Sequence, residues 1–366
     1  MTTLAGADIP GGDPTGASES LVTAKLSVPT ARHLVVPRAR LFARLSQGVT
    51  GPLTVVSAAA GSGKTTLVAS WVAAGLAPGR VAWLTLDAHD DQPGVFWTFV
   101  VAALRRHGVL LPASVGVPLR PDEVERSFLA ELAVALADRA EPVILVLDQF
   151  ELLSNAAVSR DLDFVLQHAA PGLRLVVLTR TDPGVLLHRL LLRADVTEIT
   201  TAEMAFDVDE AVAVLLQHGV SLPPDVLAGL QDQVRGWAAG LRLSAIAMQR
   251  RVDPASFVSA LPGGDARLAD YLVDEVLNIQ SENVREFLLR TSIVERLCPS
   301  LADALTGRGD ADLMLDTLIR SNLLVELIDE EPQWFRYHPL FAQVLRSELR
   351  RSHPEVIPGL HEAAAR

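Results

Sequence analysis

Residues 53–74 read LTVVSAAAGSGKTTLVASWVAA, and this stretch decides the fold. Its first four residues are apolar or β-branched and predict a short strand. Small residues follow in a loop that ends at Lys64, and residues 65–74 have the apolar spacing of a helix. A strand that runs through a glycine-containing loop straight into a helix is the context that a phosphate-binding loop requires.

The loop itself, AAAGSGKT at residues 58–65, fits the P-loop pattern GxxxxGK followed by Ser or Thr, except that Ala58 replaces the first glycine. Small residues let backbone N–H groups turn toward a phosphate, and the helix adds its positive N-terminal end. We expect Lys64 to reach the β- and γ-phosphates and the Thr65 hydroxyl to bind Mg²⁺. The alternative is a plain loop ending in a solvated lysine. The expected nucleotide contacts in this stretch are Ala60, Gly61, Ser62, Gly63, Lys64, Thr65 and Thr66.

Strands and helices alternate along the first 200 residues. Strands are predicted at 81–86, 143–147 and 175–178, and helices at 96–106 and 162–169. This alternation predicts an α/β fold with a parallel sheet and helices on both faces. Beyond residue 200 the pattern becomes helical, with helices predicted at 209–219, 225–250, 268–279, 282–291 and 310–321 and a hairpin at 323–337. Three helices and then a hairpin is the order of a winged-helix domain.

Helix-breaking residues and changes in composition suggest that the chain is divided into five segments. Residues 1–30, rich in Gly, Pro, Ser, Thr and Ala, are expected to form a disordered tail. A P-loop nucleotide-binding domain is expected at 31–200, a small helical lid at 201–262 and a winged helix at 263–355. Residues 356–366 are expected to begin a helical-repeat region that is cut short.

Asp148 follows the apolar run 143–147, so it emerges at the carboxyl end of a buried strand. We expect it to be the Mg²⁺ partner of the P-loop, and a simple turn cap is the alternative. The next residue, where many ATPases have a second carboxylate, is Gln149, a poor base. Glu151 can substitute only if the backbone turns near Phe150. Hydrolysis is therefore expected to be slow or absent.

Arg180 comes directly after the strand at 175–178, in the sequence TRTDP. An arginine at this strand end can sense the charge of a γ-phosphate. The alternative is an arginine that pairs with an acidic residue.

Charge and composition exclude several functions. The 366 residues carry a net charge of −12, which disfavours non-specific attraction to nucleic acid or anionic membranes. The single cysteine, Cys298, excludes an internal disulfide framework, and the nine histidines show no metal-binding spacing. No secretory signal or membrane-spanning run is apparent, so we expect a cytoplasmic protein without membrane contact.

Taken together and in this order, these motifs resemble the signal-transduction ATPases called STAND proteins, in particular the MalT-type large ATP-binding regulators of the LuxR family. The resemblance covers roughly residues 31–355. Beyond the P-loop it rests on VPR at 36–38, WLTLD at 83–87, LD at 147–148, TRTDP at 179–183, GWAAGL at 236–241, FLLRTS at 287–292 and FRYHPLF at 335–341.

The resemblance implies a P-loop domain, a helical lid and a winged helix that hold ADP in a closed monomer. Exchange for ATP, helped by an inducer, would open the module and permit self-assembly. Carried over by position, Arg38 lies near the adenine and ribose, Gly240 belongs to a lid segment over the nucleotide, and His338 contacts the ADP β-phosphate. The alternatives are a surface residue for Arg38 and a buried core residue for His338, as for Trp237.

Two departures from the family pattern affect the expected function. Gln149 puts turnover in doubt. The family continues into a helical-repeat sensor and a DNA-binding helix-turn-helix, whereas this sequence stops at Arg366, so direct DNA binding by this chain is not expected. Residues 263–366 hold 11 arginines against 18 acidic residues, which favours a regulatory winged helix over a DNA-contacting one.

The sequence thus predicts a regulatory switch in transcription that binds ATP or ADP with Mg²⁺ and hydrolyses ATP weakly at most. Expected partners are the nucleotide, further copies of the chain in the ATP state and full-length regulators of the same family. Two alternatives stay open: a P-loop ATPase enzyme with its own substrate, and a truncated interaction module that lacks DNA binding.

Overall fold

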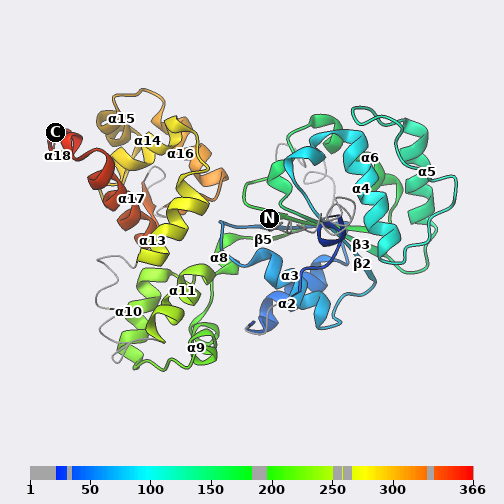
Figure 1. Cartoon of the computed structure of the whole chain (residues 1–366), viewed down its shortest axis with the longest axis horizontal. Coiled ribbons are helices and arrows are strands. Elements are labelled where there is room, and N and C mark those ends of the chain that lie inside the picture. The colour runs from blue at the N-terminus through cyan, green and yellow to red at the C-terminus, as the bar shows by residue number, and fades with distance from the viewer. Residues whose placement is uncertain are drawn as a thin grey trace, which may run out of the picture.

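The computed structural model describes residues 22–30, 35–183, 196–249, 258, 266–327 and 334–365. Figure 1 shows two lobes, one built on a β-sheet and the other mainly helical, with the short helix α8 (Thr201–Met204) between them. The first lobe confirms the predicted α/β fold. No helix in the described ranges is both long and apolar enough to cross a membrane.

The sheet has five parallel strands in the order β2-β3-β4-β1-β5. Their bounds are β1 Leu53–Ser57, β2 Arg80–Thr85, β3 Val143–Asp148, β4 Leu173–Thr179 and β5 Val196–Ile199. Every residue of β1 and β3 is buried, as expected for strands covered on both faces. The carboxyl ends of β1, β3 and β4 therefore meet at one edge, where Ser57, Asp148 and Thr179 lie.

Helices cover both faces of this sheet, as Figure 1 shows. On one face lie α2 (Ala39–Gly48) and α3 (Lys64–Ala73). On the other lie α4 (Pro93–Arg106), α5 (Arg126–Ala137) and α6 (Ala156–His168). Short 3-10 turns, η1 (Ala88–Asp91) and η2 (Phe150–Leu152), follow β2 and β3. The sequence did not predict α2, α5 or β5, the last of which is only partly buried.

The lid comprises α9 (Val208–Gln217), α10 (Pro224–Val234) and α11 (Ala238–Met248). The prediction of one helix over 225–250 is wrong, because the chain turns at Arg235 and Gly236, both with positive φ. A Cβ on Gly236 would lie 2.5 Å from the Phe206 carbonyl oxygen, so only glycine fits this close approach of two backbones.

The winged helix contains the predicted three helices and a hairpin, and it packs with the lid around one apolar core. Its helical part begins with α13 (Ala266–Leu272) and a π-helical turn, η4 (Val273–Leu277). There follow α14 (Glu282–Thr291), α15 (Pro299–Thr306), α16 (Ala311–Arg320), β6 (Val325–Leu327), β7 (Phe335–Tyr337) and α17 (Pro339–Ser352). The turn η5 (Pro354–Val356) and the helix α18 (Ile357–Ala364) come last, and α18 packs on α15 with Leu360 buried.

The expectation of a disordered tail over residues 1–30 is wrong for residues 22–30. Residues 22–25 are helical, and Leu26 is buried in the core between the sheet and α4 to α6. The prediction failed because it rested on the overall composition of residues 1–30, which does not reveal the few residues that pack in the core. Residues 1–21 lie outside the described residues.

Candidate nucleotide-binding site

The loop at residues 58–65 connects β1 to α3 with the backbone that its glycines allow. Gly61 has a φ of +70° and Gly63 one of +87°, both in the left-handed region. A Cβ on Gly61 would lie 2.7 Å from both Ala239 Cβ and Tyr271 Oη. The loop is therefore packed against the lid and the first helix of the winged helix, and it has no room for a larger residue at Gly61.

Lys64 folds back onto this loop. Its ammonium donates to the carbonyl oxygens of Ala58 at 2.5 Å and Ala59 at 3.1 Å. Burial lowers the pKa of Lys64 to about 8, against the attraction of Glu151, so the group still carries most of its charge at neutral pH. A phosphate in the loop would compete with two carbonyls for a partly desolvated cation.

Thr65 and Asp148 meet as predicted for a Mg²⁺ pair. The Thr65 hydroxyl donates to Asp148 Oδ2 at 2.9 Å, and burial raises the pKa of Asp148. A bound cation would favour the ionised carboxylate, and hydroxyl and carboxylate oxygens are the donors that Mg²⁺ prefers. The described residues contain no cluster of three or more His, Cys, Asp or Glu able to hold a metal. Mg²⁺ would therefore bind here through these two residues together with nucleotide phosphates and water.

The chain turns sharply after Asp148. Gln149 has a φ of +63°, and the turn η2 brings Glu151 toward the end of β4. There the Glu151 carboxylate accepts from the Arg180 amide at 3.1 Å and pairs with its guanidinium at 3.3 Å. The structure therefore brings Glu151 and Arg180 together, and Arg180 has the acidic partner of the alternative interpretation. Glu151 therefore faces Arg180 at the end of β4.

Three residues of the winged helix, which we call the latch, dock on the ends of β1 and β4. Asn322 donates from its side-chain amide to Ser57 Oγ and to the Arg180 carbonyl oxygen, both at 3.1 Å. The Arg320 carbonyl accepts from the Asp182 amide at 2.7 Å. Glu275 Oε2 lies 3.8 Å from Arg180 Nη2. The latch thus contacts the strand ends beside the phosphate loop.

The lid contacts the loop at residues 58–65 directly. The Trp237 indole donates to the Ala60 carbonyl at 2.9 Å, and the Ala239 amide donates to the Gly61 carbonyl at 3.0 Å. Gly240 makes room for this indole, because a Cβ there would lie 2.7 Å from Trp237 Cε3. The predicted lid segment therefore does touch the loop, with Trp237 as its main contact.

His338 lies behind Trp237. Its ring packs edge-on against the indole at 5.9 Å between centroids, and Nε2 donates to the Val234 carbonyl at 3.0 Å. Burial lowers the pKa of His338 to about 4, so the imidazole is neutral at physiological pH. Within the described residues His338 does not line the cavity at the phosphate loop, and its path to the loop runs through Trp237.

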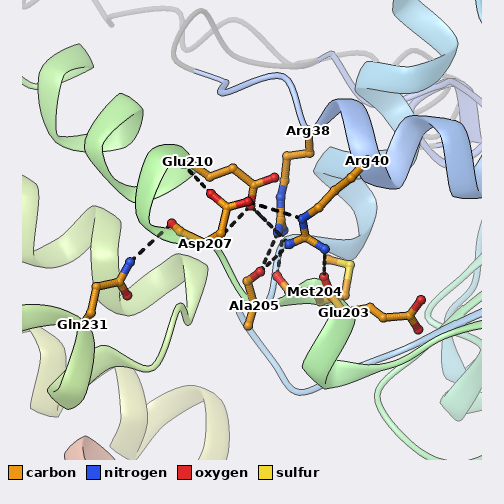
Figure 2. Close-up of polar contacts among 8 residues, drawn as sticks. All are labelled: Arg38, Arg40, Glu203, Met204, Ala205, Asp207, Glu210 and Gln231. Atoms are coloured by element: carbon orange, nitrogen blue, oxygen red, sulfur yellow. Dashed lines mark hydrogen bonds and ion pairs between the residues drawn. The ribbon is translucent and has the colours of Figure 1, made fainter. Parts of the chain in front are cut away.

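Arg38 is buried at the junction between the sheet domain and the lid, which Figure 2 shows. Its guanidinium donates to the carbonyls of Met204 and Ala205 and to Glu210 Oε2, at 2.7–2.8 Å. Arg40 binds the same linker and the same carboxylate. Arg38 therefore lines the cavity while its charged end holds the hinge to α9.

A cavity of about 590 Å³ opens between α2, α3 and the lid, which is within the usual range for small-molecule sites. Of the predicted contacts, Arg38, Gly61, Ser62, Gly63, Thr65 and Thr66 line it. Ala60, Lys64, Asp148 and Gly240 lie outside the lining. Other lining residues are mostly apolar and include Val36, Phe42, Phe206, Leu243, Ile246 and Tyr271. One end of the cavity is thus formed by the loop at residues 58–65, and the other end is mostly apolar.

Sequence reasoning missed the latch residue Asn322, the aromatic Tyr271 and Lys25, whose ammonium lies 2.7 Å from carboxylates of both Asp87 and Asp90. Neither Asn322 nor Tyr271 belongs to a motif. Lys25 carried one signal, since it is one of only two lysines in the chain.

Known proteins are similar to this chain over most of its length. Residues 273–357 match the MalT winged helix domain. The HTH-type transcriptional regulator MalT of Serratia proteamaculans is 35% identical over 356 residues, and the MalT of Yersinia enterocolitica is 34% identical over 357. Each match covers 94% of this chain and 38% of the relative, so the chain spans less than half the length of these curated relatives.

Among solved structures, a Walker-type ATPase of Pyrococcus abyssi superposes with a TM-score of 0.62 at 14% identity, covering 87% of this chain and 98% of the other. At this identity the likeness concerns the fold alone. The predicted resemblance is confirmed: over 94% of its length this chain is similar to MalT regulators, its residues 273–357 match the MalT winged helix domain, and its fold is like that of a Walker-type ATPase.

Proposed function

We propose that this region is the adenine-nucleotide switch of a MalT-type transcriptional regulator. The observation that carries the proposal is that both lobes meet at the phosphate loop. The lid binds the carbonyls of Ala60 and Gly61, and the latch binds Ser57 and Arg180 at the neighbouring strand ends. A ligand in the loop therefore touches the surface on which the second lobe rests.

Arg180 offers a way to distinguish ATP from ADP. In this arrangement its guanidinium faces Glu151 and Glu275, one from each lobe. A γ-phosphate would attract the same guanidinium and weaken its pairing with Glu275. ADP would leave the latch in place. The closed arrangement is then the ADP state, and ATP favours release of the winged helix.

Mg²⁺ bound through Thr65 and Asp148 would neutralise phosphate charge next to Lys64. Hydrolysis is expected to be slow, because Gln149 is a poor base and Glu151 is held by Arg180. Opening would expose the surfaces now buried between the lobes, and these would serve self-assembly and contact with full-length regulators. Control of transcription would then depend on parts of the regulator outside this chain.

A P-loop ATPase with its own substrate is the second candidate. The turn after Asp148 favours this candidate, because it brings the Glu151 carboxylate close enough to Lys64 to raise the pKa of the lysine. Steady ATP turnover at the rate of ordinary enzymes, on the order of 1 per second or more without any inducer, would support this candidate against the switch.

The test is the nucleotide content and affinity of the purified protein. Denaturation should release ADP, and titration calorimetry with Mg²⁺ should show binding of ADP and ATP. Lys64→Ala should abolish both. Arg290→Ala is the matched control, because it removes a partly exposed cation whose ion pair within the described residues is with Glu286 on α14. Normal binding by Lys64→Ala would refute the site.

A further inference from the structure

The segment at residues 22–30, which we call the strap, is fastened by a buried charge. Lys25 Nζ lies 2.7 Å from carboxylate oxygens of Asp87 and Asp90 and 4.2 Å from the centre of the Phe99 ring. Asp90 is completely buried, and the Lys25 side chain is only 13% exposed. A buried carboxylate needs a partner, so removing this lysine would leave Asp90 uncompensated.

Beyond Lys25 the strap crosses the edge of the sheet. Leu26 packs in the core on the face of α4 to α6, and its carbonyl accepts from His107 Nε2 at 2.7 Å. Val28, two residues on, packs against the core on the opposite face, with α2 and α3. The strap therefore joins the cores on the two faces of the sheet.

The last residues of the strap reach the cavity. Pro29 and Thr30 line it together with Phe42 of α2 and with Ala69 and Ser70 of α3. These two α3 residues are five and six positions past Lys64, and at 1.5 Å per residue they lie about 8 Å along the helix from the phosphate loop. The strap therefore lines the end of the cavity that lies away from the phosphate loop.

We infer that the strap, anchored by Lys25 between Asp87 and Asp90, is part of the nucleotide site and holds the nucleoside end of the ligand through Pro29 and Thr30. The inference rests on the proposed function. Pro29 offers an apolar face to a base, and Thr30 a hydroxyl to a polar group of the nucleoside. Lys25 is a positioning residue, which acts through the residues it holds in place.

This role requires coupling between the strap and the nucleoside. If docking of the strap favours binding of the nucleoside, binding must favour docking by the same factor. An inorganic phosphate chain occupies only the loop end and does not gain from the strap. The contrast between ADP and tripolyphosphate therefore separates a binding role from a purely structural one.

The composition supplies a direct assay, because Lys25 and Lys64 are the only two lysines in the chain. A lysine-specific endoprotease can then cut only in the strap and in the phosphate loop. ADP with Mg²⁺ should slow cleavage at Lys25 about tenfold, and tripolyphosphate should leave that rate unchanged, while both ligands protect Lys64. Protection of Lys64 alone by ADP would overturn the inference and spare the proposed function. Protection of neither lysine would overturn both.

Calorimetry on Lys25→Met gives the second measurement. We expect ADP to bind about tenfold more weakly and tripolyphosphate within twofold of the unchanged chain. Thr23→Ala is the control, because Thr23 is an exposed strap residue whose backbone carbonyl, rather than its side chain, accepts from Ser27. Equal losses for ADP and tripolyphosphate, or no loss for either, would contradict a role at the nucleoside end.

Discussion

Replacing Asn322 by alanine should release the winged helix from the sheet. The Asn322 side chain makes three hydrogen bonds that hold the winged helix in place: two donated to Ser57 Oγ and the Arg180 carbonyl of the sheet lobe, and one accepted at 2.8 Å from Thr201 Oγ1 of α8, which lies between the lobes. At about 1 kcal/mol net for each bond, their loss shifts the docking equilibrium by about 2–3 kcal/mol. That is a factor of roughly 30–150 in the population of the undocked form.

The assay is hydrogen exchange at the Asp182 amide, which donates across the same boundary to the Arg320 carbonyl. Its protection in Asn322→Ala should fall by the factor above, while amides inside β3 keep theirs. Asn322 has a φ of +46°, so Asn322→Gly, which accepts this backbone freely, separates the lost hydrogen bonds from strain. Unchanged protection of Asp182 in both variants would refute the latch.

Two further predictions concern the hinge and the lid. Glu210→Gln should lower the free energy of unfolding by about 2 kcal/mol in urea titrations, because buried Arg38 loses its ionic partner. The control, Glu286→Gln, removes the more exposed Glu286–Arg290 ion pair and should lower the free energy of unfolding by less than about 0.5 kcal/mol. Equal effects of the two substitutions would contradict a hinge role. The folded-state pKa of His338, about 4, lies below its unfolded value, so the neutral ring stabilises the fold fully above pH 6.5 and this stabilisation is lost as the pH falls toward 4. Between pH 7.5 and pH 5.5, the free energy of unfolding should therefore fall by about 1.4 kcal/mol less in His338→Asn than in the unchanged chain. Identical decreases in the two proteins would show that His338 does not titrate as its burial requires.

The phosphate loop was predictable because its requirements are local. Gly61 and Gly63 must adopt positive φ, and Lys64 and Thr65 must open a helix, all within one short stretch. The buried run before Asp148 likewise placed that carboxylate at a strand end by periodicity alone. Local backbone demands leave a readable pattern in the sequence.

The partners of the loop were not predictable in this way. Asn322 and Ser57 are 265 positions apart, and Lys25 and Asp90 are 65 apart. Such contacts arise only when the lobes or the strap dock, and a single polar residue in a loop or a tail carries no periodic signal. The contacts of Arg38 were not predictable for the same reason. The resemblance placed Arg38 near the adenine, whereas in the structure its guanidinium binds backbone carbonyls of the hinge that belong to no motif.

Small-angle X-ray scattering on the dilute protein with Mg²⁺ tests most directly whether the nucleotide sets the arrangement of the lobes. With ADP, the account predicts a profile that matches the docked lobes of Figure 1. With a non-hydrolysable ATP analogue, it predicts a larger radius of gyration at the lowest concentrations, before any assembly. Superimposable profiles with the two nucleotides, both bound, would contradict the switch.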